Sequence, residues 1–276
     1  MRLFAAIVLV AGLLTAGCGS AGGDSILDKD TLVVGVRTDL PSLGYKRPDG
    51  KLEGFDIDVA HYIAAKLERR IRFLPVTADE RISVLTKETG KTKKKKADLV
   101  LGTLSVTPER KDKIAFAGPY YNSYQDIMVQ PGDTGVTKVR DLKGRKFCSL
   151  QGVDPTARLL ALKGMTVQLV RAENYDQCME KFRAGDVAAI STNDVILAGL
   201  IKRESGRKPR LVNVKISEQN TGIGIRQGDL DGCEALNRAI TQMYQDKTAS
   251  KLATKWFGGT GLDTSIIEVP QFEGCD

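Results

Sequence analysis

The stretch 102–121 carries residue types suited to holding an anion. It follows an apolar run of strand length, and Thr107, Pro108 and Glu109 then supply a cap, a first-turn proline and a first-turn acid, which predict a helix start. Arg110 therefore falls in the first turn of that helix. Amides at a helix start have no partner within the helix, so an arginine beside them favours a carboxylate ligand. On its own, Arg110 is equally compatible with an ordinary surface arginine.

A second arginine stands at a position where ligands are often bound. Arg37 directly follows the β-branched run 31–36, which predicts a strand. Open α/β sheets bind ligands just outside the carboxyl ends of their strands, so Arg37 is a second candidate for the same kind of site.

Predicted strands and helices alternate along the chain. In the first hundred residues we expect strands at 31–36, 71–75 and 99–104 and helices starting near Phe55 and at 81–86. After a crossing at 126–129 we expect strands at 146–150, 166–170 and 188–191, with helices near 156–162, at 175–184 and at 195–203. Extended segments at 211–216 and 222–225 and a long amphipathic helical region at 230–256 complete the chain. This alternation implies two α/β units with parallel sheets.

The composition limits the classes of function. The chain of 276 residues is 42% hydrophobic, so it can bury one large core or two ordinary ones. The net charge of +7 is moderate and is partly concentrated in Lys91 and 93–96. We interpret this run as a solvated loop, with contact to anionic lipid or wall polymer as the alternative. Nucleic-acid binding does not follow from it.

The first residues have the pattern of a signal peptide. Arg2 precedes an apolar stretch at 3–14, and small residues then lead to Cys18, as at a bacterial lipoprotein processing site. The leucine stands four residues before Cys18, where three is usual, and simple secretion is the alternative. We expect a signal peptide at 1–18 with lipidation at Cys18, followed by a flexible tether at 19–30.

Four further cysteines would lie in an oxidising compartment. Four thiols allow three pairings, and proximity along the chain favours Cys148 with Cys178 and Cys233 with Cys275. The cysteines lack the paired spacing and the histidine partners of a zinc site.

Other candidate groups are better explained without catalysis. Asp56 and Asp58 stand at a helix start, where carboxylates cap amides and favour the positive end of the dipole. His61, the single histidine, lies in the same helix without the neighbours of a triad or a metal site. No nucleophile, phosphate-loop or dinucleotide motif occurs in the sequence, so no cofactor is expected.

Three motifs occur together along the mature chain. They are Gly54-Phe55-Asp56-Ile57-Asp58-Val59, Thr107-Pro108-Glu109-Arg110 with the later Phe116 and Pro119-Tyr120, and Lys255-Trp256-Phe257-Gly258. Their combination resembles the polar amino-acid family of bacterial extracellular solute-binding proteins, the external receptors of ABC importers. Within it, Asp39-x-Pro41-x-Leu43-Gly44, Cys148-Ser149 and the segment 192–199 resemble glutamate-binding lipoproteins of actinobacteria.

The resemblance implies a fold and a domain division. The fold is α/β of the periplasmic-binding-protein type, with two lobes, each a mainly parallel sheet flanked by helices, joined by two hinge strands. Lobe 1 is then expected at 31–127 plus 224–276 and lobe 2 at 128–223. The ligand lies in the cleft, and its contacts to both lobes shift the population toward a closed form.

The resemblance also implies residue roles. Arg110 would pair with the α-carboxylate of the ligand, helped by the Ser105 hydroxyl and by the backbone near Gly102. Arg37 matches a position at which binders of acidic amino acids place a basic residue, which binds the side-chain carboxylate of the ligand. Two guanidiniums in one cleft favour a dicarboxylate, so glutamate or aspartate is the expected ligand.

Two features depart from the family pattern. Asn193 stands where an aspartate usually holds the ligand ammonium, so either the adjacent Asp194 takes that role or the ammonium is held more weakly. Asp154 and Thr156 lie where the family usually offers neutral donors to the carboxylate, and Asp154 would instead meet the ammonium.

The expected function is that of a lipid-anchored, extracytoplasmic receptor that is monomeric and delivers an acidic or polar amino acid to ABC permease subunits. Two alternatives stay open. One is a sensor lipoprotein without a transport role, which the absence of a neighbouring permease gene would favour. The other is an enzyme resembling cyclohexadienyl dehydratases, with Asp154 as the general acid, which turnover of a bound acid would favour.

Overall fold

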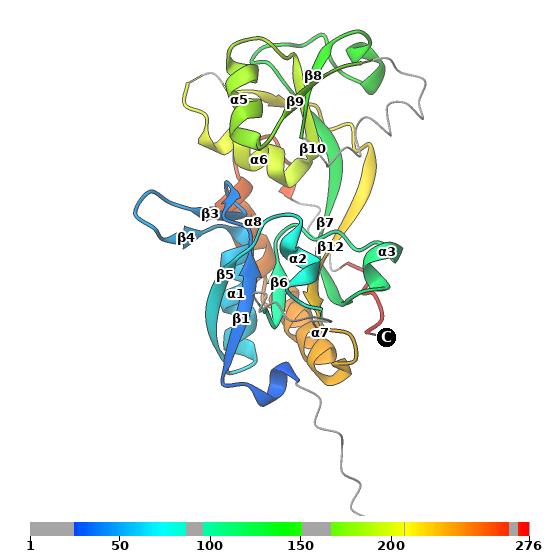
Figure 1. Ribbon diagram of the computed structural model, residues 1–276. Helices are drawn as coiled ribbons and strands as arrows, with labels where there is room; N and C mark the ends of the chain where they lie inside the picture. The colour runs from blue at the N-terminus through cyan, green and yellow to red at the C-terminus, as the bar shows by residue number, and fades with distance from the viewer. Residues whose placement is uncertain (1–24, 87–95, 151–166, 207, 265–269, 276) are drawn as a thin grey trace, which may run out of the picture.

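The computed structural model describes residues 25–86, 96–150, 167–206, 208–264 and 270–275. These residues form two α/β lobes connected by two long strands, as Figure 1 shows. The expected signal peptide with Cys18, most of the lysine run and the helix expected near 156–162 lie outside the described residues.

The first lobe is built on parallel strands. β1 (Thr31–Val36) pairs with β5 (Arg70–Pro75) on one side and with β6 (Leu99–Leu101) on the other. Helices α1 (Phe55–Lys66) and α2 (Glu80–Ser83) connect these strands. The expected alternation of strand and helix is confirmed, and β1 is aliphatic and mostly buried because helices cover both faces of a parallel sheet.

Three short strands form a separate antiparallel sheet. They are β2 (Asp39–Leu40), β3 (Gly44–Lys46) and β4 (Leu52–Glu53). The β3–β4 hairpin projects away from the first lobe near the boundary with the second (Figure 1). The remaining short elements are η1 (Ile26–Asp28), α3 (Pro108–Lys111) and η2 (Val139–Leu142). The flexible tether expected at 19–30 is therefore wrong for its last residues, because Ile26 is buried and its amide donates to the Asp229 carboxylate at 2.8 Å.

Two antiparallel strands cross between the lobes. β7 (Ala115–Val129) and β12 (Ser217–Ile225) pair over most of their length, and both are longer than the segments 126–129 and 222–225 expected to be extended. Gly118, Pro119 and the polar residues that follow interrupt the apolar pattern of β7. The strand nevertheless continues, because its neighbour β12 supplies backbone partners on both sides of this interruption.

The second lobe repeats the arrangement. β8 (Lys146–Leu150) runs parallel to β9 (Gln168–Ala172) and to β10 (Ala189–Asn193), and β10 pairs antiparallel with the far end of β7. Helices α5 (Tyr175–Arg183) and α6 (Asp194–Arg203) lie close to the expected ranges. The fold is therefore the expected two-lobed α/β architecture, with one continuous sheet path of order β5-β1-β6-β12-β7-β10-β8-β9.

Other predicted elements were also wrong in extent, among them the strand expected at 99–104 and the helix expected at 81–86, which end at Leu101 and Ser83. The strand expected at 211–216 is reduced to β11 (Arg210–Leu211), because Asn213 and Lys215 adopt left-handed conformations with φ of 61° and 42° that end the strand. The helical region expected at 230–256 is broken into α7 (Leu230–Gln245) and α8 (Thr248–Phe257).

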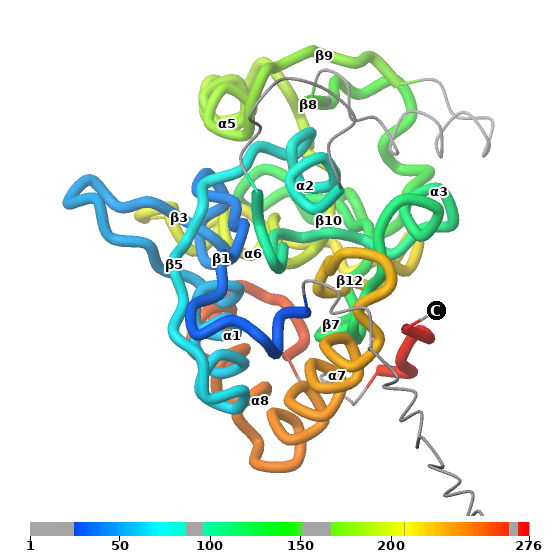
Figure 2. Tube along the Cα trace, turned by 60° about the horizontal axis from the view of Figure 1, so that its bottom comes forward, coloured from blue at the N-terminus to red at the C-terminus, as the bar shows by residue number. Residues whose placement is uncertain are grey.

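The break between α7 and α8 has a local cause. Lys247 takes a left-handed φ of 62°, and the Asp246 carboxylate accepts a hydrogen bond from the amide of Thr248 at 3.0 Å. An aspartate that accepts from the amide two residues ahead stabilises a turn in competition with a continuous helix. Figure 2 shows the three long helices α1, α7 and α8 gathered on one side of the first lobe.

The start of α1 differs from the expectation that its acids cap amides. The N-cap residue is Gly54, with no side-chain cap hydrogen bond. Asp56 is buried and accepts a bond from the Tyr120 hydroxyl at 2.7 Å, while Asp58 accepts from Lys255 and from the Trp256 indole, each at 2.7 Å. Burial raises the pKa of Asp56 to about 6, against the lowering effect of the Tyr120 bond. These acids therefore join elements of the first lobe.

Buried side chains are continuous through both lobes. One cluster extends from Leu32 and Ile63 in the first lobe to Phe182 and Leu197 in the second. Two smaller clusters cover the opposite sheet faces of the two lobes. In the described part of the chain, no helix is long and apolar enough to cross a membrane.

The structure contains both disulfides favoured by proximity along the chain. Cys148 is bonded to Cys178 with a Cα–Cα distance of 5.6 Å, and Cys233 to Cys275 with 5.8 Å. The first bond ties β8 to α5 in the second lobe, and the second ties α7 to the C-terminal segment.

Helix α6 packs closely against the first lobe. A Cβ atom on Gly199 would lie 2.0 Å from the carbonyl oxygen of Pro41, so only glycine permits this approach of the two backbones. Near the end of the same helix, the Arg203 guanidinium lies 5.4 Å from the centre of the Tyr45 ring. The lobes therefore meet at α6 as well as through β7 and β12.

Gly199→Ala is expected to lower the free energy of unfolding by roughly 1 to 3 kcal/mol, because α6 must move away from Pro41. Urea denaturation followed by circular dichroism measures this loss. Gly135→Ala is the matched control, since its Cβ would meet nothing closer than 3.4 Å. Equal stability of the two variants would contradict the close approach.

Candidate functional site

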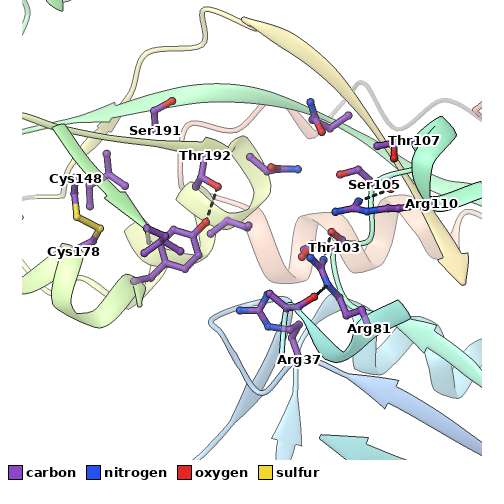
Figure 3. Close-up of a pocket in the computed structure, with 17 residues that line it drawn as sticks. Arg37, Arg81, Thr103, Ser105, Thr107, Arg110, Cys148, Cys178, Ser191 and Thr192 are labelled. Carbon is purple, nitrogen blue, oxygen red and sulfur yellow. Dashed lines mark hydrogen bonds between the residues drawn. A yellow bond between two sulfur atoms is a disulfide. The ribbon is translucent and has the colours of Figure 1, made fainter. Parts of the chain in front are cut away.

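A cavity of about 320 Å³ lies between the lobes. Lobe 1 lines it with Arg37, Ala78, Arg81, Thr103, Ser105, Thr107 and Arg110. Lobe 2 contributes the bonded pair Cys148 and Cys178, together with Tyr175, Ser191, Thr192 and Asn193. Figure 3 shows the labelled arginines on one side of this space and Thr192 with the disulfide on the other.

The parallel sheet of lobe 1 explains why these residues meet. β1, β5 and β6 run in the same direction, so their carboxyl ends lie at one edge. Arg37 directly follows β1, Arg81 lies in α2 just beyond β5, and Ser105 follows β6. Three segments far apart in sequence therefore present side chains at one place, as open α/β sheets do at ligand sites.

Arg37 is held by an ion pair and by close packing. Its Nε donates to Oδ1 of Asp39 at 2.7 Å and its Nη2 to Oδ2 at 2.5 Å. A Cβ atom on Gly102 would lie only 3.1 Å from Cγ of Arg37. Gly102 does not line the cavity itself, and it gives Arg37 the room to lie across β6. The two hydrogen bonds from Arg37 to Asp39 fix the plane of the Arg37 guanidinium.

Arg81 is a site residue that the sequence interpretation missed. Only 9% of Arg81 is exposed, and its Nη1 donates to the carbonyls of Gly102 at 2.9 Å and Thr103 at 2.7 Å. Burial, followed by the positive charges of Arg37 and Arg110, lowers the pKa of Arg81 to about 10. Its position beyond β5, at the same sheet edge as Arg37, was the signal that could have identified it.

Arg110 and Ser105 are neighbours in the wall of the cavity. Nη1 of Arg110 donates to the Ser105 carbonyl at 2.6 Å, and burial lowers the pKa of Arg110 against the opposing charge of Glu109. Helix α3 has only four residues, and the cap expected from Thr107 is wrong, because the Thr107 side chain forms no cap hydrogen bond. The positive charge at this point comes from the guanidinium rather than from a long helix.

Lobe 2 faces the arginines with neutral groups. The Tyr175 and Thr192 hydroxyl oxygens lie 2.7 Å apart, and the Asn193 amide donates to Oγ of Ser123 at 3.0 Å. Burial raises the pKa of Tyr175, while Arg37 and Arg81 across the cavity lower it. Cys148 and Cys178 place their disulfide in the cavity wall.

Asn193 and Asp194 lie on different sides of the strand-to-helix junction. Asn193 ends β10 and lines the cavity. Asp194 begins α6, is 6% exposed and lines a separate hollow of about 50 Å³ with Asp126 and Lys215. Of the two candidates for the ligand ammonium, the structure thus brings only Asn193 to the cavity. Asp154 and Thr156 lie outside the described residues.

Burial raises the pKa of Asp194 to about 7, against backbone amides of Tyr124 and Val195, with Asp126 adding to the rise. Because this pKa lies above the ordinary value of 3.8, the stability contributed by the protonated carboxyl is fully present below about pH 4 and is lost as the pH rises through about 7. Relative to Asp194→Asn, wild-type stability should therefore fall by roughly 3 to 4 kcal/mol between pH 4 and pH 8. Urea denaturation at both pH values measures this difference. If the difference in stability between wild type and Asp194→Asn does not change with pH, the buried environment of Asp194 is contradicted.

The electrostatics of the cavity favour an anion. Three guanidiniums and several neutral donors line it, and the charged residues on its described lining are all arginines. Among the described residues, no cluster of three metal-ligating side chains occurs. An anion with two carboxylates can contact guanidiniums at both ends while reducing their mutual repulsion.

Comparison with known proteins identifies the family of this chain. Residues 32–259 match the model of bacterial extracellular solute-binding proteins, family 3. The glutamate-binding protein GluB of Corynebacterium glutamicum is 29% identical over 270 residues, which cover 94% of this chain and 90% of GluB. The glutamine-binding protein GlnH of a Bacillus subtilis ABC transporter is 28% identical over 91% of this chain and 95% of GlnH.

Solved structures share the fold. An ancestral arginine-binding protein bound to arginine matches with a TM-score of 0.69 and 31% identity, over 83% of this chain and 99% of the other. The ancestral amino acid-binding protein AncCDT-1, a precursor of cyclohexadienyl dehydratase, matches with a TM-score of 0.69 and 29% identity, over 84% and 99%. Because the family model spans most of the sequence, this chain belongs to the bacterial extracellular solute-binding proteins of family 3.

Proposed function

We propose that this protein is the receptor of an ABC importer for an acidic amino acid, glutamate or aspartate. The observation that carries the proposal is the convergence of Arg37, Arg81 and Arg110 on one cavity between two lobes. A dicarboxylate matches these guanidiniums at both of its ends.

The residues take complementary roles in this proposal. Arg110 and Ser105 hold the α-carboxylate, and Arg37 and Arg81 hold the side-chain carboxylate. Asn193 approaches the ligand from lobe 2, so a bound ligand contacts both lobes and favours the closed form. Gly102 supports Arg37 rather than touching the ligand.

The relatives support an amino acid as the ligand, but their names give different amino acids. Their names assign glutamate to GluB, glutamine to GlnH and L-cystine to TcyJ of Escherichia coli. Residues of the cavity, and not family membership, must therefore select the ligand. A cavity lined by three arginines favours glutamate or aspartate over the neutral amides.

Attachment to the membrane through a lipid on Cys18 is part of the proposal. The small residues before Cys18 support it, and the residues between Cys18 and Ser25 would form a tether that lets the lobes reach permease subunits. We further propose that the bound ligand is released unchanged. Recovery of a chemically altered acid from the purified protein would instead favour the dehydratase alternative.

A thermal-shift screen of the mature protein against the common amino acids tests the proposal. Glutamate or aspartate should raise the melting temperature, because a ligand at a hundredfold excess over its dissociation constant stabilises the folded state by about 2.7 kcal/mol. Asp194→Asn, which changes a carboxylate outside the cavity, is the control that should respond like wild type. An absence of any shift with both acids would rule out the proposed ligand class.

A further inference from the structure

We propose that the disulfide between Cys148 and Cys178 is a thiol-exchange site that faces the ligand cavity and reacts preferentially with thiols carrying a carboxylate. The arginines of the cavity bind the carboxylate, and the sulfur of the same molecule attacks the disulfide. This inference rests on the proposed function, because it uses the same arginines for anion binding, and it adds a covalent modification to that site.

The disulfide is part of the wall that a bound ligand faces. Only 3% of Cys148 and 1% of Cys178 are exposed, yet both residues line the cavity of about 320 Å³ between the lobes. Leu150, two residues beyond Cys148 on β8, and Tyr175, three residues before Cys178 on α5, line the cavity as well. Residues with these spacings share one face of a strand or of a helix. A thiol therefore reaches the disulfide from the cavity.

The arginines act on this part of the wall. Burial raises the pKa of Tyr175, whereas Arg37 and Arg81 lower it. Asp39 acts in the opposite direction, so two positive charges stand against one negative charge at this point. Because Tyr175 and Cys178 lie on one face of α5, the same charges act on the space in front of the disulfide. Figure 3 shows Arg37 and Arg81 on one side of this space and the disulfide on the other.

The reaction is a thiol–disulfide exchange. The thiol loses its proton to water, its sulfur forms a bond to Sγ of Cys148, the Sγ–Sγ bond breaks, and the electron pair leaves on Cys178 as a thiolate. Cys178 is the fourth residue of α5, a helix of nine residues, so the positive end of the helix dipole favours this charge. A second thiol then attacks the ligand sulfur and frees Cys148. The two thiols are oxidised to a disulfide, and the protein disulfide is reduced.

Occupancy of the cavity controls this exchange. A bound ligand without a thiol fills the space in front of the disulfide and blocks the approach of another molecule. Conversely, reduction releases β8 from α5 in the cavity wall. Because coupling between two equilibria is reciprocal, a ligand that protects the disulfide binds more weakly once the disulfide is reduced.

The second disulfide of the chain is an internal control. Cys233 is 0% and Cys275 is 7% exposed, so this bond is buried to a similar degree. Neither residue lines the cavity. A thiol that is attracted by the cavity should therefore distinguish the two disulfides, whereas a thiol that enters by general loosening of the fold should not.

Competing thiols test the inference on the mature protein. Mercaptosuccinate carries two carboxylates and 2-mercaptoethanol carries none. Alkylation and mass spectrometry of the cysteine peptides give the initial rate of reduction at each disulfide, and each rate is divided by that of the same thiol with bis(2-hydroxyethyl) disulfide. We expect the corrected rate at Cys148–Cys178 to favour mercaptosuccinate by at least about fivefold. A smaller preference, or the same preference at Cys233–Cys275, overturns the inference.

Two arginine variants show whether the cavity attracts the thiol. Arg37→Gln should lower the preference for mercaptosuccinate at Cys148–Cys178 by about threefold or more. Arg183→Gln removes an exposed arginine that lies on α5 but does not line the cavity, and it should leave the preference unchanged. Equal effects of the two variants would mean that the overall charge of the protein attracts the thiol, which overturns the inference.

Protection by glutamate separates this inference from the proposed function. Saturating glutamate should slow the reaction of mercaptosuccinate at Cys148–Cys178 by at least about tenfold and leave Cys233–Cys275 unaffected. If glutamate binds in calorimetry but gives no protection, the receptor function stands and the inference fails. If mercaptosuccinate is preferred but neither glutamate nor aspartate binds, the inference stands and the proposed ligand is wrong. If the protein shows neither binding nor preference, both are wrong.

Discussion

Arg110→Ala is expected to weaken glutamate or aspartate binding by at least about 100-fold, equivalent to about 2.7 kcal/mol. The guanidinium is partly buried beside the Ser105 carbonyl, and its removal leaves a ligand carboxylate without its charged partner. Much of the loss is the cost of keeping that carboxylate unpaired away from water. Titration calorimetry measures the change in dissociation constant.

Two controls separate charge from geometry at this position. Arg110→Lys keeps the charge but loses the forked pair of donors, so its affinity should lie between those of wild type and Arg110→Ala. Arg183→Ala removes an exposed arginine that pairs with Glu204, and since neither residue lines the cavity, this variant should bind like wild type. Binding by Arg110→Ala within threefold of wild type would contradict the role of Arg110.

Removing the disulfide between Cys148 and Cys178 is expected to affect both stability and binding. The bond closes a loop with a sequence separation of 30, and its loss by double substitution to alanine should lower the free energy of unfolding by roughly 3 to 4 kcal/mol. Both cysteines also line the cavity, so the variant should bind glutamate more weakly by roughly tenfold or more.

The second disulfide provides the matched control for this experiment. Cys233 and Cys275 are separated by 42 residues, so their replacement by alanine should lower the stability by a similar amount, roughly 4 kcal/mol. Neither residue lines the cavity, and ligand affinity should remain at the wild-type value. Urea denaturation and calorimetry on both variants give the comparison. Equal losses of affinity in the two variants would refute the placement of the first disulfide in the binding wall.

The parts of the fold with strong local patterns could be predicted from the sequence. The aliphatic run of β1 and the start of α5, where Asn174 accepts a bond from the Gln177 amide, depend on neighbouring residues alone, so local rules were sufficient. The extent of β7 was not predictable in this way. Its Gly118, Pro119 and polar residues oppose a strand locally, and pairing with the distant β12 overrides them.

The candidate site could be predicted only in part, because local patterns place some of its residues and contacts between distant segments place the others. Arg37 and Arg110 follow clear strand patterns, so their approach to one sheet edge could be expected. Arg81 was missed because its buried position depends on carbonyls of Gly102 and Thr103, about twenty residues further along the chain. The choice between Asn193 and Asp194 depends on which side of the β10–α6 junction each residue occupies, which only the backbone shows.

The central claim is that charge on two carboxylates selects the ligand of this cleft. Calorimetric titration of the mature protein with glutamate and with glutamine tests it most directly, because the two ligands have nearly the same shape and differ in one carboxylate. The arginine-lined cavity predicts that glutamate binds at least tenfold more tightly than glutamine and that added salt weakens its binding. Equal or tighter binding of glutamine would contradict it.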